Sequence, residues 1–347
     1  MRTSFSISTF RLPAQRAGAG FFVATGALAS LLIAITVGIN WWIDPFDKLG
    51  RNWIGFYASK EREAKISWLG ARSYEGVLLG SSKAAYIDPL DLDRPGLFNA
   101  SFPLAVPEEM LELVRGYVAP GQVVLIGLDL YMFNEREFPW QPSGLIDSRS
   151  PLDLLRYLLS GRVLIYSLRD LGSHFAGGLP RLAAAGNVIA TPRRQRHEAM
   201  AERDYQPVLD MLTNYHFADF QFSERRVAAL SELRDLLASR SNPYVAFINP
   251  LNREVLRLLA TLPAAQSAFE RFRDEVRAVF PDVVDLADSR WSDPELYFRF
   301  DPYHYLPEVG AAFTNQEILP LLADRRAGES GRGIRPDRPE AVTGPSS

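Results

Sequence analysis

The feature that most constrains this chain is an uncharged apolar segment near its N-terminus, residues 17–43. A helix of about 20 such residues is long enough to cross the hydrocarbon core of a bilayer. A cleavable signal peptide is the alternative, but its apolar region is usually only about 7–15 residues long and ends at small residues. This run is longer, and Trp41 and Trp42 lie where an aromatic belt would meet the membrane surface. The pattern favours an uncleaved anchor over residues 20–43.

The charges beside this segment predict its orientation. Three arginines, Arg2, Arg11 and Arg16, precede it, and no acidic residue occurs before Asp44. The positive-inside rule then places residues 1–19 in the cytoplasm and everything after Asp44 outside. We therefore expect a single-pass protein of the bacterial inner membrane with a periplasmic or otherwise extracytoplasmic globular domain.

Composition excludes several classes of function. The chain has 347 residues, of which 47% are hydrophobic, and this is enough for one large domain or two smaller ones. The net charge of −3 gives no indication of a nucleic-acid partner. The sequence contains no cysteine, which excludes disulfides, thiolate nucleophiles and cysteine-based metal sites.

Beyond the anchor, the sequence alternates between strand and helix patterns. Apolar runs over residues 76–80 and 96–99 predict short strands, and Pro107 begins an amphipathic helix rich in acidic residues at its first turn. The run at 123–133 begins as a fully apolar strand. Strand, helix and strand in this order predict a βαβ unit and hence an α/β fold with a parallel sheet.

The remaining segments complete the predicted organisation. Residues 44–75 are interpreted as a stalk or lead-in, with "SKEREAK" as a solvated charge run, and residues 76–324 as one α/β domain interrupted by an insertion or cap at about 140–222. The alternation then returns as a helix capped by Ser223, a strand at 244–250, a long helix at 253–279 and a strand at 282–288. The tail, 325–347, has a composition typical of disorder.

Polar residues occur at the ends of two predicted strands and on one later loop. Gly80-Ser81-Ser82 follows the first strand, and Asp129 lies within the third apolar run. The segment "DPYHY", with Asp301 and His304, precedes the last helix. Ligands bind at the carboxyl ends of the strands in open α/β sheets, so we expect these residues to meet at one edge.

An Asp three residues before a His can orient the imidazole, which can then take a proton from a serine hydroxyl. Of the four histidines, only His304 has such a carboxylate and lies in the returning α/β part. The pattern therefore predicts a triad of Ser82, His304 and Asp301. Ser82 as a plain turn residue and Asp301 as a helix cap remain the structural alternatives.

Four blocks of the sequence together resemble the SGNH (GDSL-like) hydrolase superfamily. They are "GSSK", "FNASFPLAVPEE", "GLDLYMFN" and "DPYHY", and the resemblance covers about residues 76–320 with the middle unmatched. The chain is most similar to the membrane-anchored extracytoplasmic branch, which includes alginate-type O-acetyltransferases and the D-alanyl transfer protein of teichoic acids. The resemblance implies a flavodoxin-like three-layer domain with a parallel sheet of about five strands.

The resemblance also implies roles for individual residues. Ser82 stands at the nucleophile position, and a backbone N–H near Leu104 would help to bind the oxyanion. Asp129 stands where the family has an oxyanion-binding Asn, and an ionised Asp cannot donate a hydrogen bond. Losing one such donor typically costs about a hundred- to a thousand-fold in rate. Asn99 or Asn134 would have to substitute, or Asp129 has a structural role as a cap or ion-pair partner.

The function that this resemblance implies is O-acylation of a cell-envelope or exported polysaccharide through an ester on Ser82. The expected partners are a glycan or small acyl ester and a membrane-embedded acyl donor protein, with no cofactor and no metal. An envelope esterase with the same triad is the first alternative. A catalytically silent scaffold or glycan-binding module is the second, because of Asp129 and because the second block lacks the glycine that the family has there. The basic segment at 193–197 is interpreted as a solvated loop, with an anionic glycan or lipid headgroup as an alternative ligand.

Overall fold

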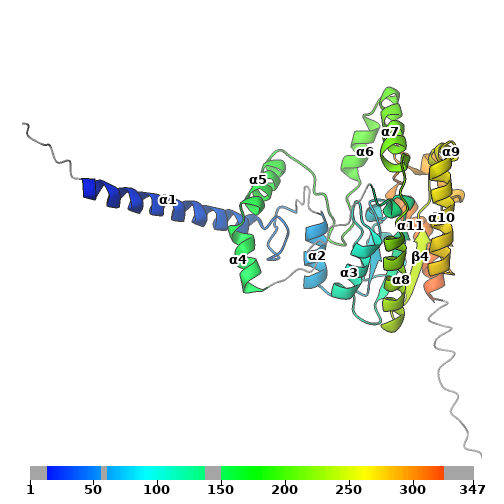
Figure 1. The fold of residues 1–347 in the computed structure, drawn as a ribbon, viewed down its shortest axis with the longest axis horizontal. Helices are drawn as coiled ribbons and strands as arrows, with labels where there is room; N and C mark the ends of the chain where they lie inside the picture. Colours follow the sequence, from blue (N-terminus) through cyan, green and yellow to red (C-terminus); the bar gives the residue numbers. More distant parts are fainter. Residues whose placement is uncertain (1–13, 56–60, 137–149, 324–347) are drawn as a thin grey trace, which may run out of the picture. The chain divides into compact units, whose positions relative to one another are not determined.

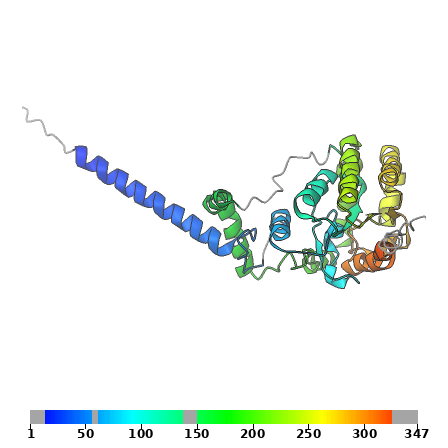
Figure 2. The same ribbon diagram turned by 90° about the horizontal axis from the view of Figure 1, so that it is seen from below.

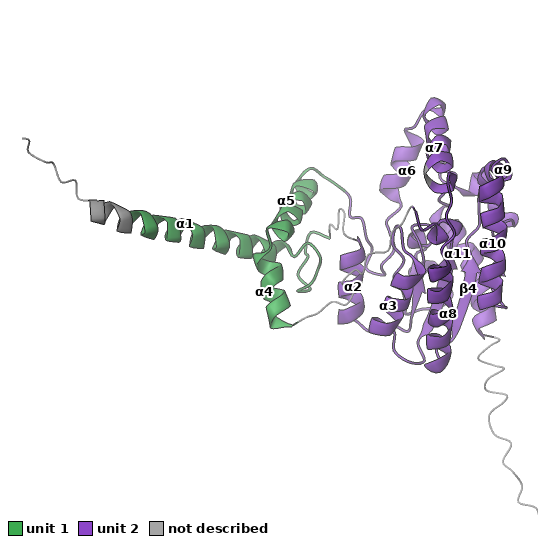
Figure 3. Ribbon diagram, in the orientation of Figure 1, with its two compact units in different colours: residues 1–56, 148–178 green, residues 57–147, 179–347 purple. Residues whose placement is uncertain are grey.

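The computed structural model describes residues 14–55, 61–136 and 150–323, and the predicted disordered tail lies outside these ranges. The chain divides into two compact units, coloured separately in Figure 3. Unit 1 comprises residues 1–56 and 148–178, and unit 2 comprises residues 57–147 and 179–347. The segment predicted as a single insertion is therefore shared between the two units.

Unit 1 is built on the long helix α1 (Ala14–Ile43), shown in blue in Figure 1. Within it, Gly20–Ile43 is long and apolar enough to span a membrane, and its most apolar window has no residue buried inside the structure. At 24 residues this segment is about 36 Å long. Helices α4 (Pro151–Leu159) and α5 (Gly161–Phe175) both pack against α1.

Unit 2 contains a sheet of five parallel strands in the order β2-β1-β3-β4-β5. The prediction of a mixed α/β fold with a parallel sheet is confirmed. Register is set by close pairing of the central strands, with Val77 opposite both Phe98 and Val124. The strands are β1 (Gly76–Leu79), β2 (Leu97–Asn99), β3 (Val123–Leu128), β4 (Tyr244–Ile248) and β5 (Val284–Asp285).

Both faces of this sheet are buried, which explains why its strands read as continuous apolar runs. Alternate residues of β3 enter different clusters, with Val124 and Ile126 on one face and Val123 and Leu125 on the other. The first face carries α2 (Glu61–Ala71), α3 (Pro107–Tyr117), α8 (Glu224–Ser239), α9 (Arg253–Ala260) and α10 (Pro263–Val279). The second carries α11 (Pro307–Phe313), and Figure 2 shows the yellow-green α8 and the orange α11 on opposite sides.

Two predictions about helices are wrong. The helix expected over 253–279 is broken into α9 and α10, because Pro263 begins a new helix and disfavours helical geometry at the residue before it. The charge run "SKEREAK" is not solvated throughout. Its described part forms the start of α2, where Glu61 is 5% exposed and Lys65 is 0% exposed.

Candidate active site

The turn that follows β1 explains why this strand ends on Gly-Ser-Ser. The chain passes from β1 through Ser81 and Ser82 directly into a short 3-10 helix at Ala84–Tyr86. A Cβ at Gly80 would lie 2.7 Å from the Cβ of Ala84, so only glycine permits this close approach. The sheet order reverses between β1 and β3, which is where ligands bind in open α/β sheets.

The two serines of this turn have different environments. Ser81 is fully buried, and its hydroxyl accepts a hydrogen bond from the backbone N–H of Lys83 at 3.1 Å while donating to the carboxylate of Asp129. Ser82 is only half-buried, and its Oγ lies 3.0 Å from Nε2 of His304. Ser81 therefore holds the turn, and Ser82 is the hydroxyl that remains accessible beside a base.

His304 and Asp301 lie on the loop before α11, and a local network fixes their geometry. Nδ1 of His304 lies 3.0 Å and 3.2 Å from the two carboxylate oxygens of Asp301. The same carboxylate accepts hydrogen bonds from the backbone N–H groups of Tyr303 and His304 at 3.1 Å and 3.2 Å. The sequence-predicted residues Ser82, His304 and Asp301 thus lie in one hydrogen-bonded line.

Burial and charge set the protonation states of this line. Burial lowers the pKa of His304 despite the opposing effect of Asp301, so the imidazole is neutral near pH 7 and can accept a proton. Burial by itself raises the pKa of Asp301, but the charges of His304 and Arg193 outweigh it and leave the pKa of this carboxyl well below its usual value. A neutral base beside an ionised carboxylate is the state that a serine–histidine pair needs to react.

A basic side chain from α6 (Thr191–Glu198) adds to this line. Nη1 of Arg193 donates to Asp301 and lies 2.8 Å from Nδ1 of His304, while its Nε donates to the Tyr86 hydroxyl at 2.7 Å. On the same helix, Nε2 of His197 is 3.6 Å from the Asp301 carboxylate. The interpretation of residues 193–197 as a solvated loop is wrong, because this segment is a helix that packs against the charged end of the triad.

Asp129, at the end of β3, is neutralised by a buried lysine. Nζ of Lys83 lies 3.1 Å from its carboxylate and 4.7 Å from the ring centroid of Tyr303, and both members of the ion pair are about 1% exposed. The amide of Asn249 also donates to Asp129, at 3.2 Å. Asp129 therefore accepts hydrogen bonds and an ammonium group, and it organises the base of the turn that carries Ser82.

The loop after β2 lies against the turn after β1. The backbone N–H of Phe102 donates to the carbonyl of Gly80 at 3.2 Å, so the two loops are joined directly. Leu104 has a left-handed φ of 61° and a side chain that is 51% exposed. The buried ammonium of Lys65 donates to the carbonyl of Ser101 in the same loop. The loop expected to supply an oxyanion donor is therefore held in place next to the turn that carries Ser82.

The two asparagines considered as substitute donors are used elsewhere. Asn99 donates through its amide to the carbonyls of Ala84 and Ile87 at 2.8 Å and 2.7 Å. Asn134 donates to the carbonyl of His216 at 3.3 Å. The structure therefore engages both amides in backbone contacts and brings neither into the hydrogen-bonded line of the triad.

Two hollows border the site. An open groove of about 470 Å³ runs along the loop of residues 294–302, and its lining includes Asp301, Tyr205 and Glu254. A smaller cavity is lined by Lys83, Asp129 and Tyr303, among others. Within residues 14–55, 61–136 and 150–323, no cluster of three or more His, Asp or Glu side chains could hold a metal ion.

Sequence reasoning missed Lys83, Asn249 and Arg193 as parts of the site. Lys83 directly follows Ser82, and Asn249 follows β4, so both had the positional signal that singled out Asp129. Arg193 had no such signal, because it reaches the site from an inserted segment whose placement no local pattern predicts. Comparison with protein-family models gave no match to this chain, and comparison with curated proteins gave no matching relative.

Proposed function

We propose that unit 2 is a serine acyltransferase that forms an ester on Ser82 and O-acylates a cell-envelope or exported polysaccharide. The observation that carries the proposal is the line from Ser82 Oγ to His304 Nε2 at 3.0 Å and from His304 Nδ1 to Asp301 at 3.0 Å. The strand order β2-β1-β3-β4-β5 supports it, because flavodoxin-like sheets have this order and the SGNH resemblance implies such a fold.

The chemistry follows from this line. The Ser82 oxygen attacks the carbonyl carbon of an acyl ester while His304 takes the hydroxyl proton, and the donor alcohol leaves with that proton. An acceptor hydroxyl then gives its proton to His304 and attacks the acyl-serine; the bond between the acyl carbon and the Ser82 oxygen breaks, and His304 returns the proton to that oxygen. The backbone N–H groups of Ser82 and the Leu104 region are the donors proposed for the oxyanion.

Asp129 does not count against activity as strongly as its sequence position indicates. A free carboxylate beside an oxyanion would repel it, but this carboxylate is paired with the Lys83 ammonium at 3.1 Å. The pair has no net charge and sits beneath the nucleophile turn. This neutralisation removes one of the two reasons for the silent scaffold, the other being the altered second block.

The membrane segment argues for an envelope substrate. Unit 2 is joined covalently to α1, which is apolar and long enough to span a membrane. With the three arginines before it, we propose that α1 crosses the inner membrane with its N-terminus inside and unit 2 outside. An enzyme held at this surface meets envelope glycans and a membrane-embedded acyl donor more readily than free metabolites.

The esterase alternative is favoured by one observation, the half-exposed position of Ser82, which leaves water able to reach an acyl-serine. Acceptor preference separates the two enzymes. The full chain in detergent is incubated with 4-nitrophenyl acetate and its intact mass is recorded, for wild type and for Ser82→Ala. We expect an adduct of one acetyl group on wild type only.

Decay of that adduct then distinguishes the outcomes. Faster decay of the adduct with an added oligosaccharide, together with formation of acetylated sugar, supports the transferase. A decay rate that does not change when the oligosaccharide is added supports the esterase. A folded wild-type chain that forms no adduct and shows no turnover would overturn both enzymes in favour of the scaffold.

A further inference from the structure

Helices α4 and α5 of unit 1 carry apolar residues on their outer surfaces. On α4 the exposed residues recur at helical spacing, with Leu152 56%, Leu155 51% and Leu159 45% exposed. On α5 they are Ile165, Leu168 and Phe175, which are 65%, 50% and 75% exposed. Residues three or four apart share one face of a helix, so each helix presents an apolar stripe to its surroundings.

The inner side of unit 1 buries polar groups together with apolar ones. The amide of Asn40 in α1 donates to the carbonyls of Leu158 and Ser160 at 2.8 Å and 3.1 Å, and its oxygen accepts from the Ser167 hydroxyl at 3.1 Å. The Tyr157 hydroxyl donates to the buried Asp44 carboxylate at 2.7 Å. Exposed apolar stripes on two helices that are tied to α1 by buried polar groups are not the pattern expected for a unit surrounded by water alone.

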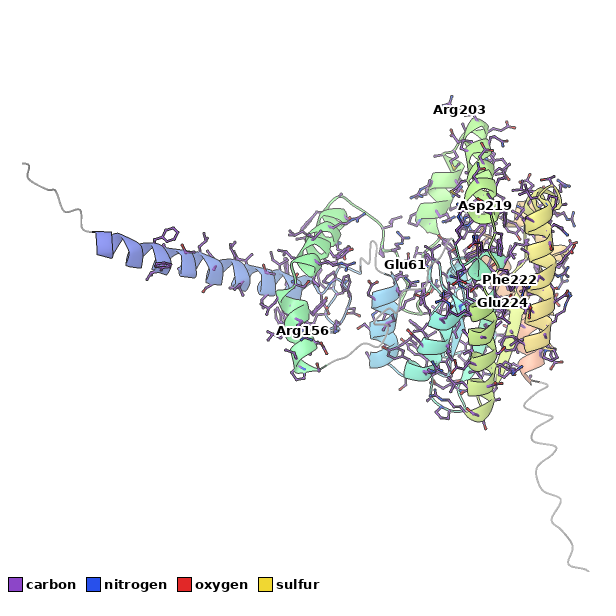
Figure 4. All side chains as sticks on the ribbon, in the orientation of Figure 1. Glu61, Arg156, Arg203, Asp219, Phe222 and Glu224 are labelled. Atoms are coloured by element: carbon purple, nitrogen blue, oxygen red, sulfur yellow. The ribbon has the colours of Figure 1, made fainter. Side chains whose placement is uncertain are left out.

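Side chains typical of a membrane surface surround these stripes. Trp41, Trp42 and Trp53 are 45%, 50% and 51% exposed, and the guanidinium of Arg51 lies 4.4 Å from the Trp41 ring centroid. Basic residues occur on both short helices, and Arg156, labelled on α4 in Figure 4, is exposed. Tryptophan and arginine concentrate where headgroups meet acyl chains.

We propose that α4 and α5 lie in the surface of the same bilayer that α1 crosses, with their apolar stripes against the acyl chains. At 9 and 15 residues they are too short to span a bilayer, which needs about 20. They pack directly on the C-terminal part of α1 through Asn40, where a spanning helix leaves the hydrocarbon core. Because this surface is continuous with the membrane-spanning part of α1, we infer that lipid covers it.

The natural absence of cysteine makes a direct test simple. Single cysteines at Leu155, Ile165 and Leu168 of the full chain are labelled with nitroxides, and the protein is placed in vesicles of phosphatidylcholine and phosphatidylglycerol. Arg203→Cys is the control, since Arg203 belongs to unit 2 and its side chain is 88% exposed. Leu28→Cys, in the middle of α1, reports whether α1 itself crosses the bilayer.

We expect labels at 155, 165 and 168 to be several-fold more accessible to oxygen than to a water-soluble nickel chelate, at a depth of about 5–10 Å. The label at 203 should show the opposite preference, and the label at 28 should be deepest. Water-like accessibility at 165 and 168 with a buried label at 28 would overturn the proposal. Spin–spin broadening that disappears on dilution with unlabelled chain would overturn it too, in favour of a second copy as the occupant.

Discussion

Nη1 of Arg193 lies 2.8 Å from Nδ1 of His304 while also donating to Asp301, so a fixed cation adjoins the base of the triad. A guanidinium cannot accept a proton, and in the proposed mechanism it repels the imidazolium that forms when His304 takes the proton of Ser82. Burial is the largest cause of the lowered pKa of His304, and Arg193 lowers it further. Arg193 therefore opposes the charge that the reaction creates on its neighbour.

Replacing this cation should shift the pH profile. In Arg193→Gln the pKa of His304 rises, because a neighbouring positive charge is removed. Activity requires neutral His304, so the acidic limb of kcat/KM for 4-nitrophenyl acetate should move to higher pH. Arg193→Lys should keep the wild-type limb. A uniform loss of rate at every pH in Arg193→Gln, with no shift of the limb, would contradict this role.

Replacing each of the two adjacent serines should have different effects on stability and on adduct formation. Ser81→Ala removes the buried hydroxyl that bridges Asp129 and the Lys83 backbone, which should lower the free energy of unfolding by about 1–3 kcal/mol. It should still form the acyl adduct, more slowly. Ser82→Ala should leave stability nearly unchanged and form no adduct. Denaturant unfolding and intact mass measure the two properties on the same samples, and an adduct on Ser82→Ala would refute the assignment.

The Lys83–Asp129 pair should behave as a unit. Removing one partner leaves the other charge buried and alone, so Lys83→Met and Asp129→Asn should each lower the free energy of unfolding by about 3–5 kcal/mol. The double variant should lose much less than the sum of the two. A double-mutant cycle in denaturant provides the measurement, and additive losses would show that the two charges are not coupled.

Buried Lys65 should give stability its own pH dependence. Burial lowers the pKa of this ammonium to about 8, whereas the unfolded chain keeps the ordinary value near 10.5. Between these values the unfolded state holds the proton more tightly, so this lysine destabilises the protein below pH 8 and ceases to do so above pH 10.5. The difference corresponds to about 3 kcal/mol.

Comparison with Lys65→Met isolates this effect, because other groups titrate alike in both proteins. We expect the wild type to gain stability relative to Lys65→Met as the pH rises from 8 to 10.5. A difference that stays constant across this range would mean that Lys65 titrates normally. Loss of the Ser101 contact lowers the stability of the variant at every pH. The diagnostic quantity is therefore the slope of the stability difference against pH.

The sheet and the triad were predictable because their signals are local. The apolar runs at β1 and β3 and the Asp-x-x-His spacing depend on short stretches of chain, and parallel strands bring their carboxyl ends together whatever lies between them. Arg193 was not predictable in this way. It reaches Asp301 across 108 residues from an inserted helix, and no periodicity specifies where such a helix packs.

The predictions of a continuous helix across Pro263 and of a solvated Lys65 were wrong for different reasons. Pro263 is a visible helix breaker that amphipathic periodicity on both sides obscured. Lys65 stands in a charged run, which ordinarily faces water, but it is buried, and its ammonium donates to the carbonyl of Ser101. Tertiary contacts of this kind override composition and leave no trace in the local sequence.

Because the two units alternate along the chain, unit 2 is attached to unit 1 at more than one point. The backbone crosses between the units three times, at residues 56–57, 147–148 and 178–179. A protease that cut only between residues 56 and 57 would not release unit 2. Asn40 would still be hydrogen-bonded to the α4–α5 hairpin, which is continuous in sequence with unit 2. Release of unit 2 from the membrane would require cuts at the other two crossings as well. Deletion of α1 alone would leave the polar groups that contact Asn40, and the apolar stripes of α4 and α5, exposed on the released protein.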